Sequence, residues 1–146
     1  MQNINIIIGS DHAGFELKLK IIEYKFREKI SFYDAGTFTK DSVDYPDYGK
    51  LVAQKVDNGK FLRGILICGS GVGMSIVANR YKNVRAALCI DEKMAILSRQ
   101  HNDANIIVLG SRLISFEQAI KCLEGFFFTN FEKGRHIARI NKLNNH

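Results

Sequence analysis

The order of apolar segments along the chain constrains its fold more than any other feature. Five short apolar runs, at residues 4–9, 30–36, 62–69, 84–90 and 105–110, alternate with longer segments of helical periodicity. Short apolar runs are typical of strands buried on both faces of a parallel sheet, and the periodic segments are typical of the helices that cover such a sheet. The alternation therefore predicts a doubly wound α/β fold.

The helices are expected at residues 15–29, 48–56, 73–81, 91–100, 115–128 and 131–143, with Asp91 as the N-cap of the fourth. Right-handed crossovers leave few topologies for such a chain. We expect a three-layer, Rossmann-like, five-stranded parallel sheet of order 2-1-3-4-5 with a C-terminal helix. Because the sequence contains no linker or internal repeat, residues 1–146 are expected to form one domain.

In this topology, ligands bind beyond the carboxyl ends of strands 1 and 3. The two loops that reach this crevice are GSDHAG (residues 9–14) and CGSGVG (residues 68–73). Asp11 either caps the helix that follows or serves a ligand, and His12 is expected near any bound anion. Arg112 follows the fifth strand at the same edge of the sheet.

The glycine loop itself leaves several interpretations open. Amides of Gly69, Gly71 and Gly73 at the start of a helix would attract an anion. The dinucleotide fingerprint needs a glycine where Met74 stands, although Asp91 lies at the distance of its acidic residue. The Walker pattern lacks its Gly-Lys-Ser/Thr end. An anion cradle, a nucleotide-binding module and a simple tight turn therefore remain as alternatives.

The three cysteines match neither a disulfide framework nor a zinc motif, which indicates a reducing cytoplasm. Cys68 ends a buried strand, a place where most cysteines are inert. It also stands at the start of a helix, which favours the thiolate. Cys89 and Cys122 lack that setting and are expected in the core. Ser70 is either a turn residue or a proton relay.

His101 and Asn102 precede the fifth strand and so belong to the amino edge of the sheet. A strand of five or six residues is about 17–20 Å long, so His101 is not expected to reach Cys68 of its own chain. His101 is either an ordinary loop residue or serves the site of a partner across a two-fold dimer.

The net charge of +6, from 21 basic and 15 acidic residues, attracts anions. Without a long basic run or an RNA-binding signature, a phosphorylated small molecule is the expected partner, and nucleic acid is not. Arg135 and Arg139 share one helix face, either as a solvated basic face or as a pair for a phosphate dianion. No apolar run is long enough to span a bilayer, and the first residues do not resemble a signal peptide, so a cytoplasmic protein is expected.

Six segments, GSDHAG, DYPDYG, CGSGVGMSIVANR, HNDAN, LGSR and GRHIARI, occur here in the order found in the type B ribose-5-phosphate isomerase family. That family also contains galactose-6-phosphate and allose-6-phosphate isomerases, and the resemblance covers nearly the whole chain. It implies the doubly wound fold, a homodimer or sometimes a tetramer with shared active sites, and a reaction without metal or organic cofactor.

The resemblance also implies an aldose–ketose isomerase that interconverts ribose 5-phosphate and ribulose 5-phosphate through an enediolate. Cys68 matches the base that moves a proton between C1 and C2, Ser70 a hydroxyl that assists at the second oxygen, and Asp11 a residue near the sugar. His101 matches the ring-opening residue, which comes from the neighbouring subunit. The other implied contacts to sugar, intermediate and phosphate are His12, Tyr45, Gly69, Gly71, Val72, Gly73, Asn102, Arg112, Arg135 and Arg139.

Three alternatives to that activity remain. The sugar is either the five-carbon phosphate or a six-carbon one, allose 6-phosphate or galactose 6-phosphate. A nucleotide-binding module is the alternative of another class. A non-catalytic subunit is disfavoured, because the chain keeps Cys68, Arg135 and Arg139.

Overall fold

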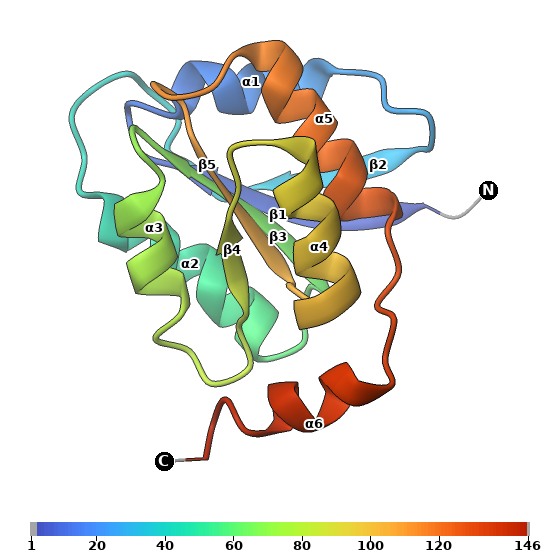
Figure 1. Cartoon of the computed structure of the whole chain (residues 1–146). Helices are drawn as coiled ribbons and strands as arrows, with labels where there is room; N and C mark the ends of the chain where they lie inside the picture. Colours follow the sequence, from blue (N-terminus) through green and yellow to red (C-terminus); the bar gives the residue numbers. More distant parts are fainter. Residues whose placement is uncertain (1–2, 146) are drawn as a thin grey trace.

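A five-stranded, all-parallel sheet runs through the centre of the molecule (Figure 1), a computed structural model that describes residues 3–145. Its strands are β1 (Ile4–Ser10), β2 (Ile30–Asp34), β3 (Arg63–Cys68), β4 (Ala86–Leu88) and β5 (Ile106–Gly110). Each strand coincides with one of the five apolar runs, so the predicted doubly wound class is confirmed.

The strand order is β2-β1-β3-β5-β4, so the expected order 2-1-3-4-5 is wrong in its last two places. The five residues of β5 are all buried, whereas the three residues of β4 are only half-buried. A fully apolar strand gains most from an inner position, and a very short strand loses least at an edge. β5 therefore lies beside β3, with Cys68 opposite Gly110.

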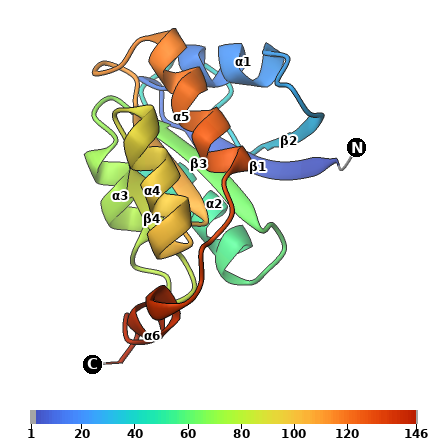
Figure 2. The ribbon, with the colours of Figure 1, turned by 45° about the vertical axis from the view of Figure 1, so that its right-hand side comes forward.

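Helices cover both faces of the sheet (Figures 1 and 2). One face carries α1 (Phe15–Glu23), α4 (Glu92–Asn102) and α5 (Phe116–Phe128), and the other carries α2 (Tyr45–Asp57) and α3 (Val72–Ala78). Side chains of β1 alternate between the two cores: Ile6 and Ile8 face the first, and Ile7 faces the second. Within the described residues, the helices are too short and too polar to cross a membrane.

Some helix boundaries differ from the predicted ones. α1 ends at Glu23 instead of residue 29, because the chain becomes extended at Tyr24 and turns Phe26 onto Phe127, with ring centroids 5.2 Å apart. α2 begins three residues early, at Tyr45, with Pro46 in its first turn, where the missing amide of proline costs least. Asp91 caps α4 as predicted, by accepting a 2.8 Å hydrogen bond from the amide of Met94.

The last helix, α6 (Arg135–Asn141), stands apart from the three layers (Figure 2). It is shorter than the predicted helix 131–143, because Lys133 and Gly134 adopt positive φ values of 64° and 57° and interrupt any helix there. α6 packs against the end of α4, at the amino edge of the sheet. The basic residues of α6 consequently lie near His101 and not near the glycine loop.

Candidate active site

Backbone hydrogen bonds join the loops at the carboxyl edge of the sheet. The amide of Asp11 donates to the carbonyl of Ile67 over 3.2 Å, which attaches the loop after β1 to the end of β3. The amide of Arg112 donates to the carbonyl of Gly69 over 3.0 Å, which attaches the loop after β5 to the glycine loop. Because β5, and not β4, lies beside β3, Arg112 at the end of β5 lies directly beside the glycine loop.

Cys68 is the last residue of β3 and only 5% exposed. Its Sγ accepts a 3.2 Å hydrogen bond from the amide of Gly71. Gly71 is left-handed (φ 80°), and a Cβ at this position would lie 2.4 Å from Cδ1 of Leu88. Only glycine fits this turn, and the turn directs an N–H dipole at the sulfur, which stabilises negative charge there.

Two side chains lie across the glycines of the loop at van der Waals distance. A Cβ on Gly69 would stand 3.0 Å from Nη1 of Arg112, and one on Gly73 would stand 2.6 Å from Cε1 of Tyr45. The glycines therefore allow the Arg112 guanidinium to approach the backbone directly after Cys68, and the Tyr45 ring to approach the first turn of α3. This packing places a cation and a phenol against the glycine loop.

The amides of the glycine loop do not all remain free for a ligand. The amide of Gly71 faces the sulfur, and that of Val72 donates to Oγ of Ser70 over 3.2 Å. The first hydrogen bond within α3 runs from Ser75 to the carbonyl of Gly71, so the amides of residues 73 and 74 have no acceptor inside the helix. These two amides are the better candidates for an anion.

Asp11 and His12 both hold local structure at this edge. Oδ1 of Asp11 accepts a 3.0 Å hydrogen bond from the amide of Gly14. Gly14 itself is the N-cap residue of α1, and this helix has no side-chain cap, so the expected capping role of Asp11 is wrong. Nδ1 of His12 accepts a 3.2 Å hydrogen bond from the amide of Val43. A neutral His12 therefore carries its proton on Nε2, which makes Nε2 a donor.

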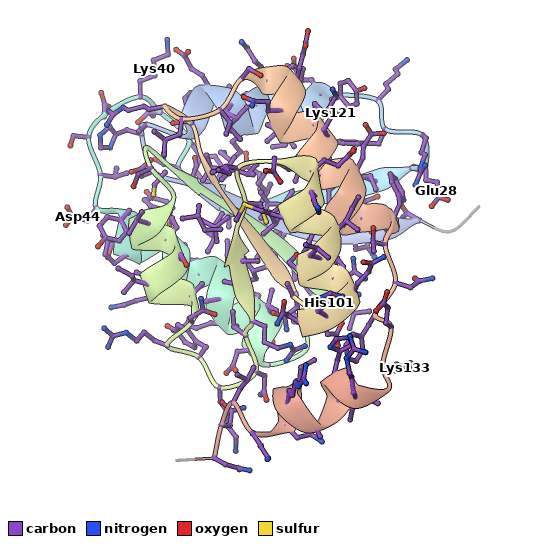
Figure 3. All side chains as sticks on the ribbon, viewed as in Figure 1. Glu28, Lys40, Asp44, His101, Lys121 and Lys133 are labelled. Carbon is purple, nitrogen blue, oxygen red and sulfur yellow. The ribbon has the colours of Figure 1, made fainter. Side chains whose placement is uncertain are left out.

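A second group of predicted residues gathers at the amino edge. His101 and Asn102 end α4 and share a hollow of about 270 Å³ with residues of α6 and the tail. The other residues that line this hollow are His136, Arg139, Ile140 and Leu143. Arg135 is exposed at the start of α6. Figure 3 shows His101 at the end of α4 that faces α6.

The two groups lie at opposite edges of the sheet. Cys68 pairs with Gly110 at one end of β5, whereas His101 precedes Ile106 at the other end. Four residues of strand alone span about 13 Å. We call Asp11, His12, Tyr45, Cys68, residues 69–73 and Arg112 the carboxyl-edge cluster. His101, Asn102, Arg135 and Arg139 form the amino-edge cluster.

Two residues that the sequence analysis did not select belong to the amino-edge region. The rings of His101 and His136 stack with centroids 4.5 Å apart and an interplanar angle of 15°. Oε1 of Glu132 lies 3.7 Å from Nε2 of His101 and 3.6 Å from Nε2 of His136. Burial, followed by the charges of His101 and Arg135, lowers the pKa of His136, so this ring is neutral at neutral pH. The signal available in the sequence was the four-residue spacing from Glu132 to His136.

The donor atoms of His101, Glu132 and His136 all lie within 4.8 Å of one another, close enough for a metal ion to be considered. The ring nitrogen lone pairs lie in the ring planes, and these planes are nearly parallel and stacked. Two stacked imidazoles cannot both point at one ion at a bond length of about 2.0–2.1 Å. In this arrangement the three residues therefore do not form a metal centre.

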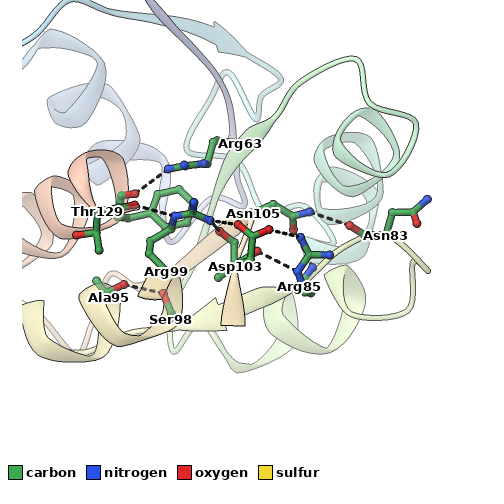
Figure 4. Close-up of polar contacts among 11 residues, drawn as sticks. Arg63, Asn83, Arg85, Ala95, Ser98, Arg99, Asp103, Asn105 and Thr129 are labelled. Carbon is green, nitrogen blue, oxygen red and sulfur yellow. Dashed lines mark hydrogen bonds and ion pairs between the residues drawn. The ribbon is translucent and has the colours of Figure 1, made fainter. Parts of the chain in front are cut away.

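A polar network fixes the end of α4 (Figure 4). Nη1 of Arg99 donates to Oδ1 of Asp103 over 2.8 Å and to the carbonyl of Ala104 over 2.7 Å. Nε of Arg99 donates to the carbonyl of Thr129 over 3.2 Å, which ties α4 to the segment that leads to α6. The buried Arg99 therefore fixes the end of α4, which carries His101, relative to the segment that carries Glu132.

Cysteine, histidine, acid and glycine amides at the carboxyl edge of a doubly wound sheet are typical of an enzyme site for a small molecule, and this edge is the candidate active site. A model of the Ribose/Galactose Isomerase family matches residues 6–143. The ribose-5-phosphate isomerase B of Escherichia coli K12 is 40% identical over 138 residues, which cover 94% of this chain and 93% of that protein.

Known structures agree with this match. The ribose 5-phosphate isomerase of Thermotoga maritima has 49% identity and a TM-score of 0.94, over 98% of this chain and 99% of that one. The Mycoplasma genitalium ribose-5-phosphate isomerase B with bound ribulose-5-phosphate has 42% identity and a TM-score of 0.85, over 99% of this chain and 95% of that one. The chain belongs to the Ribose/Galactose Isomerase family and is an isomerase.

Proposed function

We propose that this protein interconverts ribose 5-phosphate and ribulose 5-phosphate at active sites that two subunits share. The observation that carries the proposal is the division of the predicted residues between two edges of the sheet, with Cys68 at one and His101 at the other. The base Cys68 and the ring-opening residue His101 therefore belong to different edges, and one chain alone does not bring them together. The names of the Escherichia coli and Mycoplasma genitalium relatives support the choice of substrate.

Cys68 is the base of the isomerisation step. Its thiolate takes the proton from C2 of the open-chain aldose, the C–H electron pair forms the C1–C2 double bond, and negative charge moves to the oxygen on C1. The thiol then returns the proton to C1 to give the ketose. The hydrogen bond from Gly71 to Sγ supports this role, because it favours the charged sulfur.

The glycine loop stabilises the enediolate. Amides of residues 73 and 74 lack intrahelical acceptors, and such fixed donors are worth about 3–4 kcal/mol each in comparable sites. Ser70, whose exposed hydroxyl already accepts from Val72, keeps its own proton for transfer between the two sugar oxygens. Asp11 and Tyr45 contact the sugar hydroxyl groups.

The phosphate is held by cations from both clusters. His12 and Arg112 come from the carboxyl-edge cluster, and Arg135 and Arg139 come from the amino-edge cluster of the partner subunit. Guanidinium groups match the oxygens of a phosphate dianion in a bidentate way. The same partner subunit supplies His101 for ring opening and Asn102 for the intermediate.

Exposed apolar side chains around the edge strand β4 support a dimer at this edge. β4 lies in front in Figure 1, between α3 and α4. Large apolar residues on α3, on α4 and on the loop between β4 and α4 are 37–52% exposed, and they are Val72, Ile76, Ile90, Met94 and Leu97. An exposed apolar patch of this kind marks an interaction site, and a two-fold axis through it would bring each amino-edge cluster to the other subunit.

Subunit mixing tests the shared site. Cys68→Ser and His101→Asn dimers are each expected to keep a small, measurable residual activity with ribose 5-phosphate, less than about 1% of the wild-type value. After exchange at equal concentrations, we expect roughly a quarter of the wild-type activity, because half of the dimers are mixed and each mixed dimer has one intact site. The proposal is wrong if confirmed mixed dimers show no more than this residual activity.

The family description leaves a six-carbon sugar as the second candidate, because it includes galactose isomerases. Rates with ribose 5-phosphate, allose 6-phosphate and galactose 6-phosphate separate the two. We expect the highest kcat/KM with ribose 5-phosphate, and a higher value with either hexose phosphate would reassign the substrate.

A further inference from the structure

One carboxylate lies at the edge of the two stacked histidine rings of the amino edge. Oε1 of Glu132 lies 3.7 Å from Nε2 of His101 and 3.6 Å from Nε2 of His136. The side chain of His136 is only 8% exposed, and the His101 ring stacks on its face. The half-exposed His101 ring thus contacts the buried His136 ring with its face and lies near the Glu132 carboxylate with its Nε2 edge.

The backbone fixes Glu132 relative to the end of α4. Its amide donates to the carbonyl of Gln100 over 3.0 Å, and Gln100 directly precedes His101. Lys133 and Gly134, both with positive φ, then turn the chain so that His136 returns to the same place one turn later. Glu132 is therefore part of a defined structure, although its side chain is half-exposed.

The charges around His101 make this carboxylate important for a protonated imidazole. Arg135 and Arg139 of α6 act on the neighbouring His136 as repelling charges, and His136 and His101 repel each other when both are charged. Asp103, on the chain after α4, is already paired with Arg99 and Arg85. Among the described residues, Glu132 is the carboxylate within ion-pair distance of His101.

We propose that Glu132 is a positioning residue for ring opening, which orients His101 and stabilises its protonated form. This inference rests on the proposed function. His101 gives a proton to the ring oxygen, the bond between C1 and that oxygen breaks with its electron pair going to the oxygen, and the C1 hydroxyl returns a proton to the imidazole. The step leaves an aldehyde and consumes no net proton.

The proposal predicts an effect in one direction of the reaction only. Ribose 5-phosphate exists mainly as a furanose and must be opened before Cys68 can act. Ribulose 5-phosphate is an open chain, because its C5 oxygen carries the phosphate and cannot close a five-membered ring. A defect in ring opening therefore slows the aldose-to-ketose direction and spares the reverse, in which the open-chain aldose is released.

The test measures kcat in both directions for Glu132→Gln, with Glu117→Gln, an exposed carboxylate on α5, as the matched control. We expect kcat to fall about 10-fold or more with ribose 5-phosphate and to change less than about 2-fold with ribulose 5-phosphate. Glu132→Asp should restore part of the loss. Glu117→Gln should match the wild type in both directions, and circular dichroism should show that each variant is folded.

A double variant tests whether Glu132 acts through His101 or has an effect of its own on the reaction. Because Glu132 acts through His101, adding Glu132→Gln to His101→Asn should cause no further loss, whereas independent effects would multiply. An equal loss in both directions, no loss at all, or multiplying effects would overturn the role of Glu132 while leaving the isomerase assignment intact. A wild-type protein without activity in either direction would overturn both.

Discussion

The sulfur of Cys68 accepts a 3.2 Å hydrogen bond from the amide of Gly71, three residues further along the chain. This contact exists because Gly71 is left-handed, with φ 80°, and turns its N–H back toward the end of β3. The same turn starts α3 and packs closely against Leu88 of β4. One backbone conformation thus links the thiol, the glycine loop and the edge strand.

Gly71→Ala should disturb both stability and catalysis. The new methyl group would be 2.4 Å from Cδ1 of Leu88 at a φ that disfavours any side chain. We expect a loss of about 2–5 kcal/mol in the free energy of unfolding, from left-handed strain and overpacking together. Urea unfolding measures this loss. The matched control is Gly59→Ala, which has the same φ of 80° but nothing within 4 Å, and should lose only the strain component. Equal losses in both variants would contradict the packing argument.

Cys68→Ser should abolish the isomerisation step without unfolding the protein. A serine hydroxyl is a far weaker base than a thiolate, and a general base contributes about 10²–10⁴-fold to a rate. We expect kcat to fall by that order in both directions of the reaction, unlike the one-sided effect expected for Glu132→Gln. Steady-state assays with each sugar phosphate give the comparison, and a kcat near the wild-type value would exclude Cys68 as the base.

Lys18 and Asp34 form an ion pair, and replacing Asp34 should destabilise the protein more than replacing Lys18. Nζ of the fully buried Lys18 lies 2.5 Å from Oδ1 of Asp34, whose side chain is 27% exposed and also accepts from the amide of Gly36. Asp34→Ala leaves a buried charge without a partner, which we expect to cost about 3–5 kcal/mol. Lys18→Met should cost less, because it removes the buried charge. Urea unfolding of both variants checks the order, and a larger loss for Lys18→Met would contradict it.

The two core cysteines should make the protein less stable at alkaline pH. Burial raises the pKa of Cys89 to about 12 and that of Cys122 to about 11, from a reference value of 9.0. Above pH 9 the unfolded chain loses these protons while the folded chain keeps them. The free energy of unfolding therefore falls as pH rises, by about 1.4 kcal/mol per pH unit for each thiol.

Unfolding of Cys89→Ala/Cys122→Ala between pH 8 and pH 10.5 measures this contribution. The double variant starts from a lower stability because it leaves cavities, but its stability should fall less steeply above pH 9 than that of the wild type. Parallel curves for the two proteins would show that these thiols do not contribute.

A charge in the apolar patch beside β4 should dissociate the proposed dimer and abolish activity. Ile76 on α3 is 52% exposed in a single chain, and Ile76→Glu would place a carboxylate in the contact. Light scattering after gel filtration should show a monomer, with less than about 1% of the activity, because each site would lack the partner's His101. Leu62→Glu is the control: Leu62 is 81% exposed but precedes β3, away from this patch, and its variant should stay dimeric and active. A monomeric, fully active Ile76→Glu would refute the shared site.

Much of the candidate site was predictable because it depends on local patterns and one general rule of topology. The loops after β1 and β3 were expected at a common edge, and the structure joins them through the Asp11–Ile67 hydrogen bond. The position of His101 before the fifth strand was enough to place it at the opposite edge from Cys68. Glu132 and His136 were missed, because the positive φ values that return the chain to His101 follow from packing and not from a periodic pattern.

The sequence by itself determined which segments become strands and helices, since apolar periodicity is a property of each segment alone. It also determined which loops carry the polar residues of the site. Only the tertiary structure decided that β5 and not β4 lies beside β3, because the five buried residues of β5 compete better for an inner position than the three half-buried residues of β4. That competition involves the whole sheet, and its outcome places Arg112 next to the glycine loop.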